Sequence, residues 1–416
     1  MPAFVPDIPY HIQAVFGVTF GYIWLSAFMD KDYLKPMPED PQAHHEVLKA
    51  NVWRALSSIV LFMLAFAYLK PYQEYRVGDW MQRVHRLIVM AMLVYMCWLI
   101  FMLQMRPDYG RYILGFLDSS LNKPVTKDMH TYDDNCELEL ANIWDNMDHY
   151  YLIHWVDWIL ASLVIRDPYV LHFWQVFDEV IELSLQHILP HFRECWWDHI
   201  LMDITLSNIP AICLGMWIIR KFKIREMDWL GRHGKDHWYE WEVFHCHKKF
   251  GVLVYQQFLL CIHFANGFFV MNALLIPPKH VFPPGRMLLY FLFGALAMRE
   301  GYDDGRTWGT PERKDKPIAG RMRWLTVAAL LTEIALCWKY REGTGNILDN
   351  PTPAYKWVPW TLGCTALVAY WVYLRFKPDH TVKYPGYNNP HSPSKIMSAI
   401  KRSRSRSPSP KKHKHN

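Results

Sequence analysis

The sequence lacks several short motifs that define common classes of protein. Its eight cysteines are scattered, no two form a CxxC pair, and most lie within apolar runs. We therefore expect them to act as small hydrophobic side chains and infer no disulfide framework. N-x-S/T acceptor sites are also absent, because the near match Asn350-Pro351-Thr352 contains proline. The N-terminal stretch MPAFVPDIPYHIQ has no basic n-region and no small-residue cleavage site, so we expect no removable signal peptide.

Acidic residues are missing from the end of the chain. After Asp379 no Asp or Glu occurs, and the sequence closes with KRSRSRSPSPKKHKHN. Such a composition cannot build a hydrophobic core, so segment 380–416 is predicted to be a disordered basic tail. Its Arg-Ser repeats resemble RNA-contacting segments. Beside so many apolar runs, however, contact with anionic lipid headgroups is the better interpretation, and we expect no nucleic-acid partner.

Hydrophobic residues make up 51% of the chain and are gathered in runs. Each run is about long enough to cross a ~30 Å hydrocarbon core. The sequence therefore predicts an all-α polytopic membrane protein, with residues 1–379 forming one domain of about ten transmembrane helices. The predicted spans are 12–29, 52–69, 86–104, 149–166, 169–189, 199–219, 250–276, 284–298, 324–340 and 357–376. The eighth span is short, and the topology beyond residue 276 depends on it.

Lys and Arg residues in the loops predict the orientation. They crowd the loop between the second and third spans, the segments 220–249 and 299–323, and the tail. In a ten-span topology these regions share one face, which should be cytosolic. Segment 105–148, which is rich in Asp and Glu, then lies on the lumenal face. We expect it to pack there as short amphipathic helices.

Acidic residues gather where the fourth, fifth and sixth spans meet the lumenal side. Glu179 and Glu182 share one face of the fifth span, and Glu194 and Asp198 begin the sixth or its lead-in. Ionisable side chains within membrane segments are costly and by default functional. The residues that this topology brings to one depth are His154, Glu179, Glu182, Glu194, Asp198, Asp203 and Asn208.

Several carboxylates at one depth predict a bound cation, because like charges oppose one another's ionisation. Oxygen ligands favour Ca²⁺, which tolerates irregular geometry, or Mg²⁺. The thiolate and imidazole sets typical of zinc are not evident in this region. The alternative is structural pairing of the acids with Arg166, Arg193 and nearby histidines. His154 is a candidate general base because its ordinary pKa is near neutrality, although a lone helical histidine is more often structural.

Three other features carry less weight. His245-Cys246-His247 resembles a metal-binding fragment but has no partner ligands in its basic loop. Asp303-Asp304-Gly305-Arg306 resembles the opening of the CDP-alcohol phosphotransferase signature, whose remaining residues are absent. Arg86, at a helix entrance, can meet a lipid phosphate, but most such arginines simply extend toward the interface.

The stretch from His187 to Asn208 resembles the signature of the base-exchange phosphatidylserine synthases, H-x-L-P-N-F-x-E-C-W-W-D followed by L-D and C-N. The matching residues are His187, Leu189-Pro190, Phe192, Glu194-Cys195-Trp196-Trp197-Asp198, Met202-Asp203 and Asn208. The similarity extends upstream through Asn135-Cys136, Trp144, His154, Arg166, Glu179 and Glu182, and downstream to Leu214-Gly215-Met216. It is clear over about 130–220, the expected catalytic core, and extends over about 80–376.

The resemblance implies an endoplasmic-reticulum membrane enzyme that exchanges the headgroup of a phospholipid for L-serine, with Ca²⁺ and without nucleotide activation. It assigns catalytic roles to His154, Glu182, Asp198 and Asp203, and metal binding to Glu179, Glu182, Glu194, Asp198 and Asp203. We expect Asn208, Arg86 and His191 to contact substrate. The chain departs from the signature at His191, at Ser207 and at Ile209-Pro210, where Pro210 should kink the sixth helix.

Trp196 and Trp197 have two readings of equal weight. Their indoles can exclude water from the reacting phosphorus or anchor the helix at the membrane interface.

Two other functions stay open at this stage. A transporter or scramblase would use the buried acids for a coupling cation, and an intramembrane hydrolase would use a metal to release phosphatidic acid. The sequence leaves three further points undecided: phosphatidylcholine or phosphatidylethanolamine as donor, direct transfer or a covalent intermediate, and a monomer or a homodimer.

Overall fold

The computed structural model describes residues 10–30, 32–68, 79–122, 135–147, 149–189, 192–277, 280–307, 321–341 and 353–376. Within these ranges every regular element is a helix, as the sequence predicts. The predicted tail at 380–416 and part of segment 105–148 lie outside the described residues.

The long helices follow the apolar runs of the sequence. They are α1 (Tyr10–Ala27), α2 (Pro41–Tyr68), α3 (Asp79–Gln104), α6 (His149–Ile165), α7 (Pro168–Leu185), α8 (Ile209–Lys221), α9 (His247–Ala273), α10 (Phe282–Thr307), α11 (Arg321–Lys339) and α12 (Ala354–Phe376). Shorter elements are α4 (Pro107–Leu117), α5 (Leu140–Asn146), the 3₁₀ turns η1 (Ser119–Asn122), η4 (Trp238–Glu240) and η5 (Glu242–Phe244), and the π-helix η3 (Asp198–Asn208).

Each predicted span coincides with a helix, but the helices differ in how well they suit a membrane. Four are long and apolar enough to cross one: Pro41–Tyr68, Arg83–Gln104, Asp198–Lys221 and His247–Ala273. Ala14–Ala27 and Tyr151–Ile165 are shorter apolar helices. The protein is therefore a membrane protein, and ten crossings stay a prediction. The short eighth span proves to be part of a 26-residue helix, α10.

Segment 105–148 contains short helices, as predicted. Within its described part, Pro107–Leu117 forms α4 and Leu140–Asn146 forms α5. Glycine in α4 serves close packing, since a Cβ at Gly110 would clash with the ring of Tyr340 at the end of α11. Tyr340 in turn donates its hydroxyl to the carbonyl of Met102.

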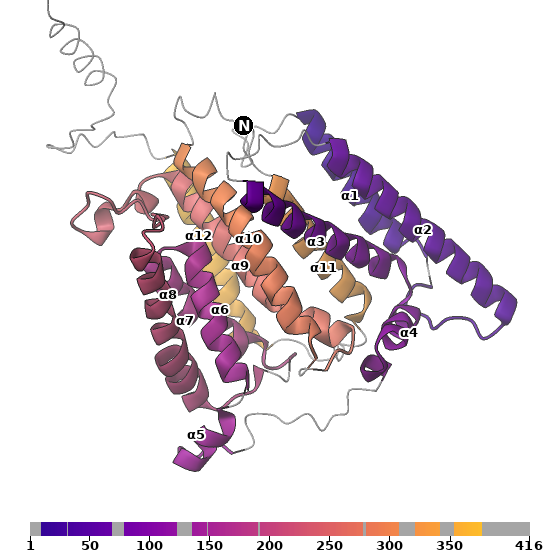
Figure 1. Ribbon diagram of the computed structural model, residues 1–416, viewed down its shortest axis with the longest axis horizontal. Coiled ribbons are helices and arrows are strands. Elements are labelled where there is room, and N and C mark those ends of the chain that lie inside the picture. The colour runs from indigo at the N-terminus through magenta and orange to yellow at the C-terminus, as the bar shows by residue number, and fades with distance from the viewer. Residues whose placement is uncertain are drawn as a thin grey trace, which may run out of the picture.

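The arrangement of the helices in Figure 1 follows from two large hydrophobic cores. The first joins α1–α4 to α9, α10 and α11, and its buried centre includes Phe62, Met96, Leu99 and Phe293. The second joins α6, α7 and α8 to α9 and α10 around Trp158, Leu171 and Ile212. Helices α9 and α10 therefore lie between the N-terminal helices and the α6–α8 group that carries the acidic residues.

Helices α6 and α8 approach each other closely at Gly215. A Cβ at this position would lie 2.5 Å from the Cβ of Ser162 on α6, so only glycine permits the contact. Ser162 is fully buried and donates its hydroxyl to the carbonyl of Trp158. This contact fixes α6 against the helix that continues from η3, and so fixes His154 relative to the acids of η3.

Candidate functional site

The sixth predicted span is not α-helical at its start. Residues Asp198–Asn208 form a π-helix, in which the backbone bonds join residues five apart, and α-helix begins only at Ile209. In an α-helix, side chains five residues apart point in directions about 140° apart. In a π-helix, five residues make close to one turn, so such side chains point in similar directions. The wider winding therefore turns Asp198, Asp203 and Asn208 toward one side, and all three are buried.

Pro210 marks the change of winding. Proline has no N–H, so in an α-helix it leaves the carbonyl four residues earlier, that of Leu206, without its bond. The hydroxyl of Tyr151 on α6 donates to this carbonyl at 3.1 Å. Within η3, Thr205 donates its hydroxyl to the carbonyl of Ile200, five residues back. The predicted effect of Pro210 on the helix thus takes the form of a π-to-α junction.

A histidine lies at the centre of the acids. Nδ1 of His199 is 2.8 Å from Oε2 of Glu179, 3.6 Å from Oε2 of Glu194 and 3.9 Å from Oε2 of Glu182. Ligand atoms of Glu179, Glu182 and His199 lie within 4.8 Å of one another, and so do those of Glu194, His199 and Asp203. The structure therefore brings four of the predicted metal ligands into two groups that share His199.

Asp198 is a further acid beside these groups, and it is buried. It opens η3 and lies within electrostatic range of Glu179 and Glu182. Every acid predicted to bind metal is thus found at this junction of α7 and η3. A cation bound by carboxylate oxygens fits this donor set.

Another buried acid, Glu333, is neutralised in a different way from the acids of the cluster. On α11, Glu333 receives both Nε and Nη2 of Arg286, at 2.9 and 2.6 Å. Tyr95 and Asn266 complete its shell, so this glutamate is neutralised by a fixed guanidinium.

Neither arginine proposed for structural pairing reaches the acidic cluster in the described contacts. Arg166 donates Nε to the carbonyl of Leu163, and Arg193 donates Nε to that of Gln186. The described ion-pair partner of Glu179 and Glu182 is His199. Of the structural pairing considered as the alternative, the described contacts show the part made by a nearby histidine and not the part made by Arg166 or Arg193; a bound cation stays a prediction.

The histidine that pairs with the acids is His199, which the sequence alone does not single out. His199 was overlooked because it stands inside an apolar stretch, HILMD, where it resembles an incidental helical residue. Only the π-helix and the packing of α7 bring it to the acids. Its Nδ1–H donates to Glu179, since a carboxylate oxygen only accepts, while its Nε2 is buried and has no hydrogen-bond partner.

The expectation that no disulfide forms is wrong. Cys136 and Cys195 are joined, across 59 residues of sequence. Cys195 directly follows Glu194, and Cys136 precedes α5, so the bond ties the segment before α5 to the lead-in of η3. The two cysteines were missed because spacing along the sequence does not reveal which thiols meet in space.

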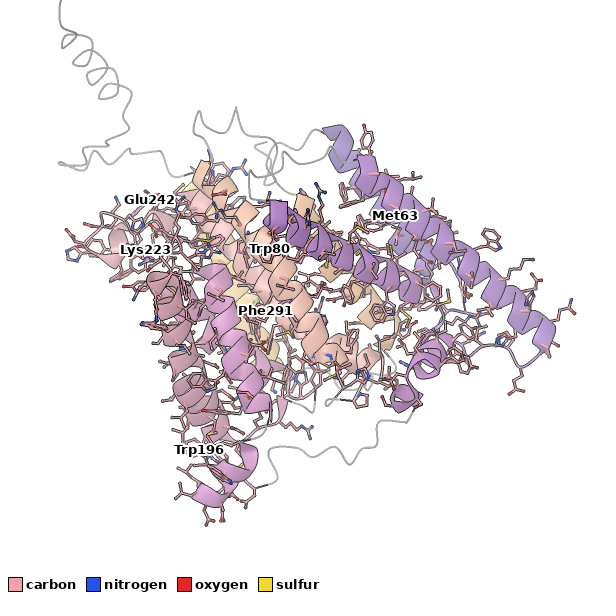
Figure 2. The ribbon with its side chains drawn as sticks, viewed as in Figure 1. Met63, Trp80, Trp196, Lys223, Glu242 and Phe291 are labelled. Atoms are coloured by element: carbon pink, nitrogen blue, oxygen red, sulfur yellow. A yellow bond between two sulfur atoms is a disulfide. The ribbon has the colours of Figure 1, made fainter. Side chains whose placement is uncertain are left out.

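The two tryptophans of the signature lie in different environments. Trp197 is buried with Cys195 and Met202, whereas Trp196 is 60% exposed. Trp197 therefore packs behind the cluster, and Trp196 suits an anchor at an interface. Figure 2 shows Trp196 at the opposite end of the helices from Lys223 and Glu242, so the acidic site and the basic loops lie at opposite ends.

The predicted base His154 lines a cavity and belongs to neither of the two groups around His199. The cavity has a volume of about 130 Å³ and also contains Asp157, Asp178 and His263 in its wall. Asp178 directly precedes Glu179 on α7 and lies within electrostatic range of both Asp157 and Asp203. The cavity and the acidic cluster are therefore adjacent, with Asp178 between them.

The three residues predicted to contact substrate have different outcomes. Asn208 is fully buried next to the cluster, and neither atom of its amide has a hydrogen-bond partner. Arg86 is exposed on α3, which packs mainly with α2, α10 and α11. The structure does not bring it to the acids. His191 lies outside the described residues.

The His245-Cys246-His247 fragment does not form a metal site among the described residues. Nε2 of His245 donates to the carbonyl of Tyr239 at 2.7 Å, and the groups of metal-binding side chains found in the described part of the chain do not include it.

Comparison with known proteins identifies the family of this chain. The model of the family described as "Phosphatidyl serine synthase" matches residues 81–341, more than half of the chain. "Phosphatidylserine synthase 2" of Rattus norvegicus is 28% identical over 380 residues, 85% of this chain and 77% of that protein. The Homo sapiens protein of the same name is 27% identical, over 88% of this chain and 75% of that protein.

A plant protein with a different name is almost as similar. "CDP-diacylglycerol--serine O-phosphatidyltransferase 1" of Arabidopsis thaliana is 26% identical, over 83% of this chain and 82% of that protein. The family match includes α6, α7 and η3, and therefore every described residue of the acidic cluster. The chain thus belongs to the phosphatidyl serine synthase family and is an enzyme of phosphatidylserine synthesis in the membrane.

Proposed function

We propose that the protein makes phosphatidylserine by base exchange. The choline or ethanolamine of a membrane phospholipid is replaced by L-serine, and one phosphodiester is exchanged for another. The observation that carries this proposal is the buried group of Glu179, Glu182, Glu194 and Asp203 around His199. The described ion pairs of Glu179 and Glu182 are with His199, and a group so rich in carboxylates is suited to a cation that binds a phosphate.

The donor set supports Ca²⁺ as that cation. Carboxylate oxygens from α7, the η3 lead-in and η3 can hold it, and an irregular set of oxygens is what Ca²⁺ tolerates best. Bound Ca²⁺ supplies positive charge that attracts the lipid phosphate and offsets the charge that develops during transfer. His199 is not a preferred ligand of Ca²⁺, and its bond to Glu179 instead orients that carboxylate.

His154 is the general base in this proposal. It accepts the proton of the serine hydroxyl, which makes the oxygen a better nucleophile toward phosphorus. The departing choline or ethanolamine oxygen then receives a proton. Asp157 lies three residues further along α6 and interacts electrostatically with His154. A neighbouring acid stabilises the imidazolium that forms when the base takes its proton.

In this proposal the site also excludes water from the reacting phosphorus. Hydrolysis would convert exchange into release of phosphatidic acid. The cavity that His154 lines is walled chiefly by apolar and aromatic side chains, and Trp197 is buried behind the cluster. The acids themselves are mostly buried, which limits the access of bulk water to the phosphorus.

We place the site on the lumenal side of the endoplasmic-reticulum membrane, with the basic loops and the tail in the cytosol. Two observations support this placement. The Cys136–Cys195 disulfide requires an oxidising compartment, and the Lys- and Arg-rich end of the helices lies opposite Trp196.

The plant relative is named for a different phosphatidyl donor, and this name gives a second candidate reaction. CDP-diacylglycerol would serve as donor, with CMP as the leaving group and the same serine nucleophile. Only the opening of the CDP-alcohol phosphotransferase signature occurs in the chain, at Asp303-Asp304-Gly305-Arg306. Base exchange is therefore the better-supported reaction.

One assay separates these reactions. Purified protein in lipid nanodiscs receives labelled serine and one donor at a time: phosphatidylcholine, phosphatidylethanolamine or CDP-diacylglycerol. We expect labelled phosphatidylserine from at least one of the first two, together with free choline or ethanolamine. Product from CDP-diacylglycerol alone, with release of CMP, would refute base exchange.

The same preparation tests the cation and the other functions. Chelation of Ca²⁺ should abolish incorporation of label, and restored Ca²⁺ should recover it; equal incorporation in both conditions contradicts the Ca²⁺ assignment. Phosphatidic acid formed without serine would identify a hydrolase. Lipid movement between leaflets with no change of headgroup would identify a scramblase.

A further inference from the structure

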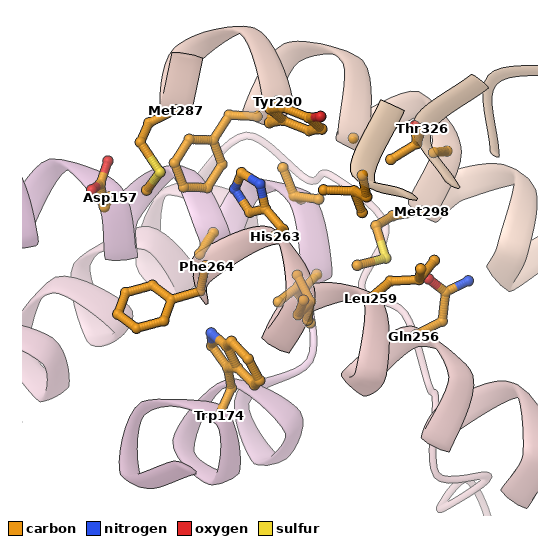
Figure 3. A pocket seen from close by; sticks show the side chains of 18 of the residues that line it. Asp157, Trp174, Gln256, Leu259, His263, Phe264, Met287, Tyr290, Met298 and Thr326 are labelled. Atoms are coloured by element: carbon orange, nitrogen blue, oxygen red, sulfur yellow. The ribbon is translucent and has the colours of Figure 1, made fainter. Parts of the chain in front are cut away.

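The cavity beside the acidic cluster has an unusual lining. It lies between α6, α7, α9, α10 and α11 and is walled mainly by apolar side chains, with a volume of about 130 Å³. An apolar cavity of comparable size in another protein stays dry and binds benzene. Here, however, the carboxylates of Asp157 and Asp178 form part of the wall, and Figure 3 shows the first of them.

Aromatic rings form much of the wall. Trp158 and Trp174 are buried and face the cavity from α6 and α7, and Phe264 and Tyr290 face it from α9 and α10. The faces of such rings carry partial negative charge and attract cations, and aromatic cages are a recurrent means of binding ammonium groups. The rings therefore favour a cationic ligand group.

Asp178 gives the cavity a carboxylate that lacks a partner. Its side chain lines the cavity, the residue is only 6% exposed, and Oδ1 has no hydrogen-bond partner. An isolated charge in apolar surroundings is costly unless an opposite charge joins it. Glu333 shows the usual solution in this protein, a fixed arginine. No described ion pair provides one for Asp178, so a charge supplied by a ligand is the complement.

The second carboxylate, Asp157, is on α6 one turn from His154. It also lines the cavity, and it interacts electrostatically with Asp178. Arg323 contributes to the lining from α11, three residues before Thr326, and Figure 3 shows Thr326 across the cavity from Asp157. The end near α6 and α7 is therefore the acidic end.

We infer that this cavity binds the ammonium group of the amino alcohol that is exchanged, between the carboxylates of Asp157 and Asp178 and the rings of Trp158 and Trp174. The inference rests on the proposed base exchange and names the residues that select its substrates. Serine, ethanolamine and choline all carry their ammonium group on the carbon next to the one that bears the reacting oxygen. A molecule held by this group would place its oxygen near His154 and its phosphorus near the acidic cluster, because Asp178 lies between the two.

A binding measurement tests the inference without turnover. Wild-type protein in nanodiscs is titrated with ethanolamine and with ethylene glycol, which has a hydroxyl in place of the ammonium. We expect ethanolamine to bind and ethylene glycol to bind at least tenfold more weakly, since a charged hydrogen bond and a cation–π contact are both lost. Equal binding of the two probes, or binding of neither, overturns the inference.

Variants then locate the site. Asp178→Asn and Trp174→Leu should each weaken ethanolamine binding about tenfold or more. Met298→Leu, which changes an apolar residue of the same cavity with little change of volume, is the matched control and should bind normally. Ca²⁺ binding is measured on every variant. Weakened ethanolamine binding with normal Ca²⁺ binding supports an ammonium pocket, whereas parallel loss of both makes Asp178 part of the cation site and refutes it.

Kinetics distinguish the two sources of the ammonium group. A raised KM for serine in Asp178→Asn, with KM for the donor lipid unchanged, assigns the pocket to the incoming serine. The reverse assigns it to the donor headgroup. An unchanged KM for both substrates contradicts the inference. If wild-type protein binds ethanolamine but exchanges no headgroup, the proposed function fails while the pocket stands.

Discussion

His199 donates a hydrogen bond from Nδ1 to Oε2 of Glu179 over 2.8 Å, and the same nitrogen lies within 4 Å of a carboxylate oxygen of Glu182 and of Glu194. One imidazole from η3 therefore contacts acids from α7 and from the lead-in of η3. This arrangement fixes the rotation of η3 relative to α7.

The first prediction concerns this histidine. His199→Ala should weaken Ca²⁺ binding and headgroup exchange by about 10–100-fold, because an acid that binds metal loses the group that orients it. His199→Asn, whose amide nitrogen can replace Nδ1, should retain more of both. The measurements are Ca²⁺ titration and labelled-serine incorporation.

His172 provides the matched control. It is a half-buried histidine on α7 whose Nδ1 bonds to Gln175 rather than to the cluster, and His172→Asn should change neither measurement much. Unchanged Ca²⁺ affinity in His199→Ala would show that the imidazole has no part in the cation site.

The second prediction concerns the Cys136–Cys195 disulfide. Under the chain-entropy account, a bond that closes a loop of this length stabilises the folded state by roughly 4 kcal/mol. Cys136→Ser should therefore lower the melting temperature and, because Cys195 adjoins Glu194, also weaken Ca²⁺ binding. Cys213→Ser, at an exposed free cysteine, is the control.

The same disulfide reports on orientation. In sealed microsomes, a membrane-impermeant reductant should leave it intact and a permeant one should reduce it, if the site is lumenal. Reduction by the impermeant reagent would place the acidic site on the cytosolic side and overturn the proposed topology.

The sequence was sufficient to predict the helices. Each apolar run that is about long enough to cross a membrane forms a helix in the structure. Such runs can be recognised from the sequence because burial of apolar surface depends little on detailed geometry. The eighth span came out short, since Arg299, Glu300 and Asp303 interrupt its apolar run. In the structure Glu300 is buried and Arg299 bonds Asp303 one turn away, so the helix continues through them.

The acidic residues of the site could be identified from the sequence, but their contacts with one another could not be predicted. Spacing on an α-helix does not place Asp198, Asp203 and Asn208 on one side, and no pattern in the sequence signals an eleven-residue π-helix. Pro210 suggested only a kink. The contact of His199 with Glu179 and the Cys136–Cys195 disulfide each join residues that are 20 or more positions apart in the sequence. Local periodicity does not encode such contacts.

The third prediction tests the π-to-α junction. Pro210→Ala restores an N–H that can bond to the carbonyl of Leu206 and compete with the hydroxyl of Tyr151. Rewinding to an α-helix would turn Asp203 and Asn208 apart. We expect thermal stability to be unchanged or higher and turnover to fall at least tenfold. A variant with normal turnover would show that the winding is not needed for activity, and Tyr151→Phe provides an independent disturbance of the same carbonyl.

The fourth prediction separates the base from the cation site. His154 lines the cavity and is not in either cation-binding group. His154→Ala should therefore reduce exchange by about 10²–10⁴-fold, the usual contribution of general acid–base catalysis, while Ca²⁺ binding stays normal. Near-normal exchange at neutral pH would remove His154 as the base. Loss of Ca²⁺ binding would instead make it part of the metal site.

The fifth prediction concerns Asp228, in the loop that follows α8. Burial alone would raise its pKa, but N–H groups of Arg232 and His233 donate to its carboxylate and hold the pKa below the usual value. A lowered pKa in the folded state contributes stability above the unfolded pKa of about 3.9, and that stability is lost as pH falls through the folded value.

Asp228→Asn should therefore lower the melting temperature at neutral pH by about 2–4 °C, corresponding to ~1 kcal/mol. The difference from wild type should shrink as pH falls below about 4, where the wild-type carboxylate itself becomes protonated. Arg232 also bonds to Asp167 at the N-cap of α7, so a weakened loop is transmitted to the helix that carries Glu179 and Glu182. A difference that stayed constant across this pH range would mean that the charge of Asp228 contributes nothing, and that the substitution acts through packing alone.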